Sequence, residues 1–206
     1  LTADVSDIAL THSTTDGMNI GIWSIDWRPG DRAVTTSLEH PGGIGALYNL
    51  RDRLGIEIVF VDVGPSRDPE DILADFDRAI DERTRAVAIS HVLWASGTVL
   101  PIARIAEMAH ARGAILVVDG AQIAGAMPVD LAATGADAYA IPAQKWLLGP
   151  EGMGAVAVAP VDGLDGGIEP GELPFGDERQ RDPYDDTVSV EVAQVDDRVP
   201  PGGQLG

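Results

Sequence analysis

Residues 85–119, RAVAISHVLWASGTVLPIARIAEMAHARGAILVVD, consist of two short apolar runs with a helical pattern between them. The runs 85–90 and 114–119 are rich in Val, Ile and Ala and have the length of buried strands. In 101–112 the apolar residues recur at helical spacing, and Gly113 is suited to end a helix. A strand, a helix and a second strand in this order predict that the two strands lie parallel in one sheet.

The same alternation continues on both sides of this stretch. In chain order we expect a helix at 17–27, a strand at 32–36, a helix at 43–54, a strand at 57–63, a helix at 69–80, and later strands at 136–141 and 154–159. This pattern predicts an α/β fold of three layers, in which helices flank both faces of a mostly parallel sheet. Ligands of such sheets bind beyond the C-terminal ends of the strands.

The composition changes after residue 159. Residues 160–206 carry 12 acidic residues, three arginines, eight glycines and six prolines. Glycine and proline at this frequency disfavour regular structure. We therefore expect 1–159 to form the folded domain and 160–206 to be an irregular acidic tail, with one possible edge strand at 187–195.

The charge balance and the absence of cysteine limit the function classes. The chain has 33 acidic and 14 basic residues and a net charge of -19. Binding to nucleic acid needs a basic face, so we expect no nucleic-acid partner. No apolar run approaches the length of a membrane span, so we expect no membrane partner. Without cysteine the chain supplies no disulfide or thiol nucleophile, and its four histidines lack the spacing of metal ligands.

Lys145 is the only lysine among the 14 basic residues. It follows the expected strand at 136–141, within the segment AYAIPAQKWLLGPEG (138–152). An amine can lose its proton and attack a carbonyl carbon, which a guanidinium cannot do, and Trp146 and Leu147 would partly shield this amine from water. The alternatives are that one lysine survived by chance, or that its side chain lies along the surface at the strand end.

Two other groups of polar residues lie where an α/β fold builds its sites. Asp119 ends a strand and Gln122 follows three residues later, although a strand-end Asp also commonly caps the next helix. Thr14 and Thr15, in THSTTDG (11–17), precede a helix whose N-terminus would suit a phosphate group. The alternative is an ordinary N-cap.

Four segments that contain these residues resemble the class V aminotransferase family of pyridoxal-phosphate enzymes. This family includes cysteine desulfurases, selenocysteine lyases and isopenicillin-N-epimerase-like proteins. The segments are ALTHSTTDGMNIGIW (9–23), DRAVTTSLEHPGG (31–43), RAVAISHVLWASGTVLPIARIAEMAHARGAILVVDGAQIAGAMPVDL (85–131) and GADAYAIPAQKWLLGPEGMGAVAV (135–158). The resemblance implies that 1–159 is the large cofactor domain of a fold-type-I enzyme, in incomplete form.

The resemblance also implies roles for individual residues. Lys145 would form the Schiff base with pyridoxal 5′-phosphate and then carry protons, and Asp119 would pair with the ring nitrogen. Gln122 would hydrogen-bond the phenolic oxygen, and His40 would stack on the ring face. We expect His91 to pack or hydrogen-bond near this site rather than to titrate in catalysis.

At the phosphate the chain departs from the family pattern. Thr14 and Thr15 match the loop that holds the phosphate. Many members have Ser-x-His before the lysine, whereas residues 142–144 here are Pro-Ala-Gln, so Gln144 replaces a histidine beside the phosphate. Trp94 stands where desulfurases have Asn. A glutamine cannot carry charge near neutral pH, so we expect weaker cofactor binding.

By resemblance the protein is an enzyme that acts on a small amino acid as an aminotransferase, lyase or epimerase. It would be a cytoplasmic homodimer. Because the chain has no thiol to accept sulfur, we expect it not to act as a cysteine desulfurase. Two alternatives stay open: a truncated, non-catalytic fragment of the cofactor domain, and a flavodoxin-like binding module that would leave Asp119, Gln122 and Lys145 unexplained.

Overall fold

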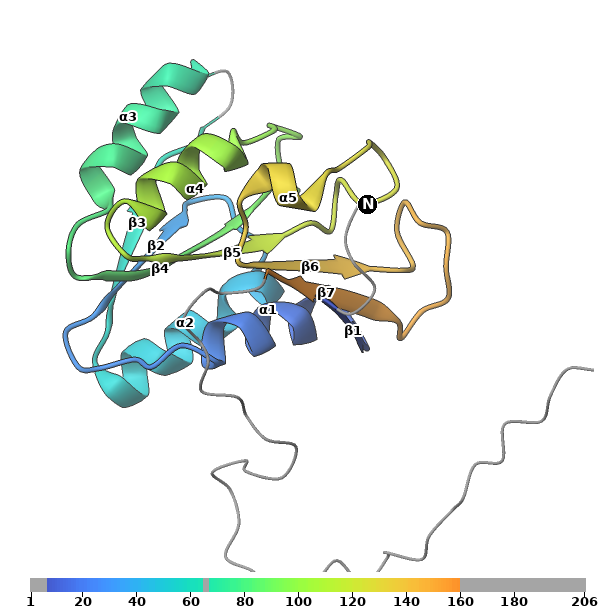
Figure 1. The fold of residues 1–206 in the computed structure, drawn as a ribbon, viewed down its shortest axis with the longest axis horizontal. Helices are drawn as coiled ribbons and strands as arrows, with labels where there is room; N and C mark the ends of the chain where they lie inside the picture. Colours follow the sequence, from blue (N-terminus) through green and yellow to red (C-terminus); the bar gives the residue numbers. More distant parts are fainter. Residues whose placement is uncertain (1–6, 65–66, 160–206) are drawn as a thin grey trace, which may run out of the picture. The chain divides into compact units, whose positions relative to one another are not determined.

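In the computed structural model, residues 7–64 and 67–159 are described. They form one seven-stranded sheet with helices on both faces (Figure 1). The elements in chain order are β1 (Ile8–Thr11), α1 (Thr14–Trp23), β2 (Arg32–Thr36), α2 (Pro41–Leu54), β3 (Glu57–Val61), α3 (Pro69–Ala79), β4 (Thr84–Ser90), α4 (Ile102–His110), β5 (Ile115–Asp119), α5 (Leu131–Thr134), β6 (Ala138–Pro142) and β7 (Gly154–Val158).

The sheet is mostly parallel, as the alternation predicted. Its strand order is β1-β7-β6-β5-β4-β2-β3. The pairs from β3 to β6 are parallel, whereas β7 is antiparallel to both β6 and β1. Because β1 and β6 are both antiparallel to β7, β1 runs in the same direction as β2 to β6. These six strands therefore end at the same edge of the sheet. The fold class is confirmed.

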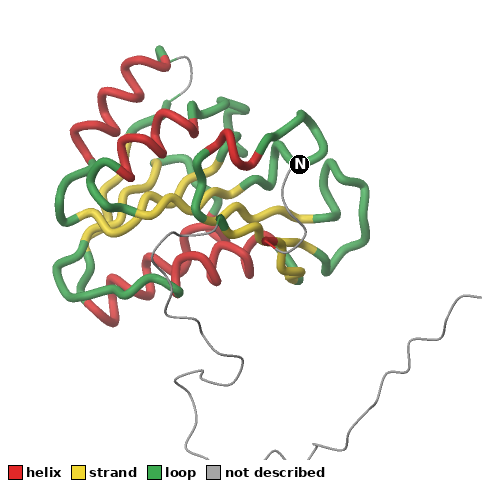
Figure 2. The backbone as a smooth tube through the Cα atoms, in the orientation of Figure 1, coloured by secondary structure: helices red, strands yellow, loops and turns green. Residues whose placement is uncertain are grey.

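Helices α1 and α2 cover one face of the sheet, and α3, α4 and α5 cover the other (Figure 2). Alternate residues of the central strands divide between two cores. Val87 and Ile89 of β4 pack into the core under α3 and α4, whereas Ala86 and Ala88 pack into the core under α1 and α2. The small alanine face lets α1 approach closely: a Cβ atom on Gly17 would lie 2.7 Å from the Cβ of Ala140.

The expected helix at 17–27 is misplaced, because α1 begins at Thr14 and ends at Trp23. Ser13 is the N-cap, and its side chain accepts a hydrogen bond from Asp16 N. Thr14 and Thr15, which were expected to precede the helix, thus lie inside its first turn. The expected helix at 43–54 likewise starts earlier, at Pro41, after the N-cap His40.

Two elements were missed and others differ at their ends. β1 has four residues, most of them exposed, and α5 has only four residues, so neither shows a clear periodicity. The expected strand at 57–63 ends at Val61, and the helix at 101–112 spans Ile102–His110. The acidic tail 160–206, with its possible strand at 187–195, lies outside the described residues.

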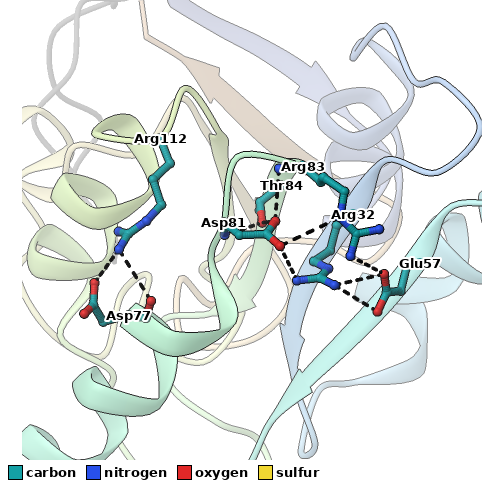
Figure 3. Close-up of polar contacts among 7 residues, drawn as sticks. All are labelled: Arg32, Glu57, Asp77, Asp81, Arg83, Thr84 and Arg112. Carbon is teal, nitrogen blue, oxygen red and sulfur yellow. Dashed lines mark hydrogen bonds and ion pairs between the residues drawn. The ribbon is translucent and has the colours of Figure 1, made fainter.

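A network of ion pairs lies at the opposite edge of the sheet, where the strands begin. Arg32 at the start of β2 bonds Glu57 at 3.0 Å and Asp81 at 2.5 Å, and Arg83 also bonds Glu57 (Figure 3). Two arginines thus face two carboxylates at this edge, and Arg32 Nε is buried there without a hydrogen-bond partner in the described structure. The candidate site described below lies at the other edge. No helix in the described part of the chain has the length and apolar character needed to cross a membrane.

Candidate active site

A cavity of about 160 Å³ opens at the edge of the sheet where the parallel strands end. It brings together all seven residues that the sequence singled out for a cofactor site. Six further residues, which sequence analysis had not assigned to the cofactor, complete the wall. The lining residues are Ser13, Thr14, Thr15, His40, Ser90, Val92, Trp94, Asp119, Ala121, Gln122, Pro142, Gln144 and Lys145.

The start of α1 forms one end of the cavity. Thr14 is only 9% exposed, and its hydroxyl has no hydrogen-bond partner within the described structure. A buried hydroxyl without a partner costs about 1–3 kcal/mol unless a ligand supplies one. The first N–H groups of a helix attract anions, so the orphaned hydroxyl and the helix start together fit a phosphate group.

His40 lies at the start of α2 and forms part of the cavity wall. Its Nδ1 accepts a hydrogen bond from Gly42 N at 3.1 Å, which leaves Nε2 to carry the proton of the neutral ring. The ring meets Trp94 edge to face, with 5.7 Å between centroids. A Cβ atom on Gly43 would lie 3.1 Å from Asp119 Oδ2, so glycine lets the start of α2 approach this carboxylate.

Asp119 ends β5 and is 6% exposed. Its Oδ1 accepts a hydrogen bond from Ala121 N at 2.8 Å, whereas no described group donates to Oδ2. Burial raises the pKa of Asp119, and the hydrogen bond from Ala121 N together with the charges of Lys145 and His40 oppose that rise. A buried carboxylate with one free oxygen and a raised pKa is suited to share a proton with a ring nitrogen.

Lys145 lies in the loop between β6 and β7 and is half-buried. It forms no ion pair with any described residue, so its amine remains available to a ligand. The side chains of Trp146 and Leu147 are about half exposed, so the expected apolar shielding is only partial. Leu148 has a φ of 55°, an uncommon value for a residue other than glycine, in the turn after the lysine.

Glu39 is a buried carboxyl that sequence analysis missed. Thr36 Oγ1 donates to it at 2.7 Å, and Ser90 donates from both its N–H and its hydroxyl. Burial raises the pKa of Glu39, the charge of Asp119 adds to the rise, and the hydrogen bonds from Ser90 and Thr36 oppose it. An acidic residue three positions after the end of β2 and directly before His40 was the signal available in the sequence.

His91 makes the hydrogen bond that was expected of it: its Nδ1 lies 2.8 Å from Tyr139 Oη. Burial lowers the pKa of His91. Burial also raises the pKa of Tyr139, with a further contribution from the Asp119 charge. Neither residue of this pair lines the cavity.

The comparisons with known proteins agree with this geometry. The family described as "Aminotransferase class-V" matches residues 1–163. A probable cysteine desulfurase of Methanothermobacter thermautotrophicus is 37% identical over 155 residues, which cover 75% of this chain and 38% of that protein. A cysteine desulfurase of Haloferax volcanii is 33% identical over 156 residues, which cover 73% of this chain and 35% of that protein.

Solved structures match in the same way. The cystine C-S lyase C-DES, in complex with its reaction product cysteine persulfide, superposes with a TM-score of 0.70 and 33% identity, covering 77% of this chain and 42% of that one. The apo cysteine desulfurase from Thermococcus onnurineus NA1 gives a TM-score of 0.68 and 30% identity, covering 77% of this chain and 39% of that one. The chain spans less than half the length of these proteins.

Proposed function

This chain belongs to the class V aminotransferase family, whose enzymes depend on pyridoxal phosphate, and on that basis we propose that 1–159 is the cofactor domain of an enzyme acting on a small amino acid. One observation carries the proposal. A single cavity is lined by an unpaired lysine, a buried carboxylate with one free oxygen, a histidine ring and an orphaned hydroxyl at a helix start.

These side chains fit the chemical groups of the cofactor one by one. The Thr14 hydroxyl and the start of α1 would hold the phosphate, with Thr15 and Gln144 beside it. Asp119 would pair with the ring nitrogen, His40 would cover a ring face, and Gln122 would donate to the phenolic oxygen. When bound, pyridoxal phosphate supplies an electron-poor ring that accepts the electron pair left at the substrate Cα.

In the proposed reaction Lys145 would hold the cofactor through its amine and would carry the proton to and from the substrate Cα. Its freedom from ion pairs supports both tasks, because an amine held by a carboxylate would be a poor nucleophile and base. Asp119 would hold a proton at the ring nitrogen, and its burial would make that charge–charge contact stronger than it would be in water. His40 would exclude water from the ring face that it covers.

Among the reactions of the family, the names of the relatives favour cleavage of a carbon–sulfur bond or a related lyase reaction. The relatives are named as cysteine desulfurases and a cystine C-S lyase. The 206 residues contain no cysteine, so the chain itself has no thiol that could take sulfur as a persulfide. Transamination and epimerisation begin with the same proton transfer at Cα and remain within the proposal.

The test of the proposal is covalent capture of the cofactor. The purified chain is mixed with pyridoxal phosphate, reduced with borohydride, digested and mapped by mass spectrometry. We expect the label on the peptide that holds Lys145, and there is no competing lysine side chain. Label confined to the N-terminal amine would contradict the proposal, and Lys145→Arg serves as the blank, since guanidinium does not react in this way.

A second candidate is a non-catalytic cofactor-domain fragment. It is favoured by the absence of arginine from the described lining of the cavity, where a substrate carboxylate would need a cation. An enzyme and a fragment differ in turnover. Labelled peptide together with no consumption of any small amino acid would indicate the fragment.

We extend the proposal to assembly and location. We propose that the protein forms a homodimer and that it is cytoplasmic, as the family resemblance implies. Sedimentation of the cofactor-loaded chain measures the first point. A monomer with full activity would contradict it.

A further inference from the structure

We propose that Trp146 is a positioning residue that fixes the Gln122 amide with its NH₂ group free for the cofactor, an inference that rests on the proposed function. Trp146 Nε1 donates a hydrogen bond to Gln122 Oε1 at 3.1 Å. The two residues lie 24 positions apart, in different loops of the site. Nothing in their spacing along the chain indicates that they meet.

The chemistry of the indole settles which way the amide is turned. An indole N–H can only donate, so the atom of Gln122 that faces it must be the carbonyl oxygen. The NH₂ group then lies at the other branch of the amide. Gln122 makes no second hydrogen bond to a described residue, so both N–H donors are unclaimed, and Gln122 lines the cavity.

A tight backbone contact holds the two loops in register. Gly125 has a φ of +91°, and a Cβ atom at this position would lie 2.5 Å from the carbonyl carbon and oxygen of Trp146. A side chain at 125 would therefore push the Trp146 backbone away. The loop after β5, which begins beside Asp119, thus packs directly against the loop that carries Lys145.

Trp146 orients the Gln122 amide although its own side chain is largely exposed. Its side chain is 55% exposed, which by itself suggests a residue of no consequence. Without the indole N–H, the amide of Gln122 could rotate and present its oxygen to an acceptor atom of the cofactor, which repels it. Fixing the amide in advance removes that rotation and so favours binding.

The hydrogen bond is measured first in the chain without cofactor. The four tryptophans give four indole N–H resonances, and Trp146→Phe identifies the one that belongs to Trp146. We expect Gln122→Ala to move this resonance upfield and Gln122→Glu, which keeps an acceptor, to leave it downfield. A resonance that ignores Gln122→Ala overturns the positioning role whatever the cofactor does.

The role toward the cofactor is measured by a double-mutant cycle on the Kd for pyridoxal phosphate, followed by absorbance. We expect Trp146→Phe to weaken binding about two- to tenfold, the range of one hydrogen bond, and to have no further effect when Gln122 is already Ala. Trp23→Phe, at an indole that is also about half exposed and far from the cavity lining, should leave the Kd unchanged.

The outcomes separate the two proposals. Trp146→Phe could weaken cofactor binding equally with Gln122 and with Ala at position 122, or it could weaken binding in neither case. Either result overturns the positioning role while the proposed function stands. Failure of the unsubstituted chain to bind pyridoxal phosphate overturns the proposed function, and the role of the amide toward the cofactor falls with it.

Discussion

Ser90 donates both its backbone N–H and its hydroxyl to Glu39, with Oγ 2.5 Å from Oε2. Thr36 donates to the same carboxyl from the end of β2. Glu39 thus ties the ends of β2 and β4 together beside Asp119, and it directly precedes His40 in the chain. The histidine that forms part of the cavity wall is held in place by a carboxyl that does not itself line the cavity.

Replacing Glu39 by Gln should change how stability depends on pH. Burial raises the folded-state pKa of Glu39 above its ordinary value of 4.5, so the folded protein holds this proton more tightly than the unfolded chain does. The stability that this adds is complete below the ordinary value and is lost as the pH rises through the folded-state pKa. We expect the free energy of unfolding of the unsubstituted chain, relative to Glu39→Gln, to fall as the pH rises above the ordinary pKa of 4.5 and through the raised folded-state pKa.

Glu57→Gln is the matched control for this experiment, which uses urea denaturation at stepped pH. The hydrogen bond from Arg32 lowers the pKa of Glu57, so its contribution is present above the ordinary value and is lost as the pH falls. The two variants should therefore show opposite slopes. A difference for Glu39→Gln that stays flat or rises with pH would contradict the role of burial.

Thr14→Val should weaken cofactor binding without loss of stability. The Thr14 hydroxyl has no partner within the described structure, so removing it costs the cofactor-free chain no hydrogen bond. A hydrogen bond to a charged phosphate is worth about 1.5–3 kcal/mol, so the Kd for pyridoxal phosphate should rise roughly tenfold or more.

Thr35→Val is its control, measured in the same titrations and thermal melts. Thr35 Oγ1 donates to Ala88 O at 2.7 Å in the core, so this variant should lose about 1 kcal/mol of stability and keep its affinity. If Thr14→Val left the Kd unchanged, the phosphate would have to lie elsewhere.

Asp119→Asn should separate cofactor binding from proton transfer. The amide keeps the volume and can still meet the ring nitrogen, but it removes the charge that keeps this nitrogen protonated. We expect near-normal capture of the cofactor and a roughly 10³-fold slower exchange of the amino-acid Cα proton with D₂O, followed by NMR.

Asp137→Asn provides the comparison for Asp119. Asp137 Oδ2 accepts hydrogen bonds from Leu116 N and His110 at the far end of the sheet. Its loss should lower stability and leave the exchange rate unchanged. Equal loss of capture and exchange in Asp119→Asn would mean that this carboxylate only supports the fold.

Gln144→His should tighten cofactor binding in a pH-dependent way. Gln144 lines the cavity. The substitution replaces its neutral amide by an imidazole ring, which becomes charged below about pH 6.5. A charged hydrogen bond in place of a neutral one predicts a gain of about tenfold at pH 6 and less at pH 8. An equal Kd at both pH values would place residue 144 away from the phosphate.

The period of the apolar residues predicted most of the fold. Strand runs such as 85–90 and 114–119 and the helical spacing of 101–112 each reflect the buried face of their own element. β1 was not predicted because its four residues are mostly exposed. The start of α1 was misplaced because Ser13, Thr14 and Thr15 are all residue types that cap helices well. Local signals define an element well and its ends poorly.

The sequence alone also determined the chemistry available: one lysine, an aspartate at a strand end, no thiol and a Ser-Thr-Thr helix start. Only the tertiary structure decided which of these groups meet. The strand order β1-β7-β6-β5-β4-β2-β3 brings α1, α2 and the loops after β5 and β6 around one cavity. It also places Glu39 within hydrogen-bond distance of Ser90, and Trp146 within hydrogen-bond distance of Gln122. Periodicity records the face that each element buries but not the neighbour that covers it, so contacts between distant loops appear only when the sheet is assembled.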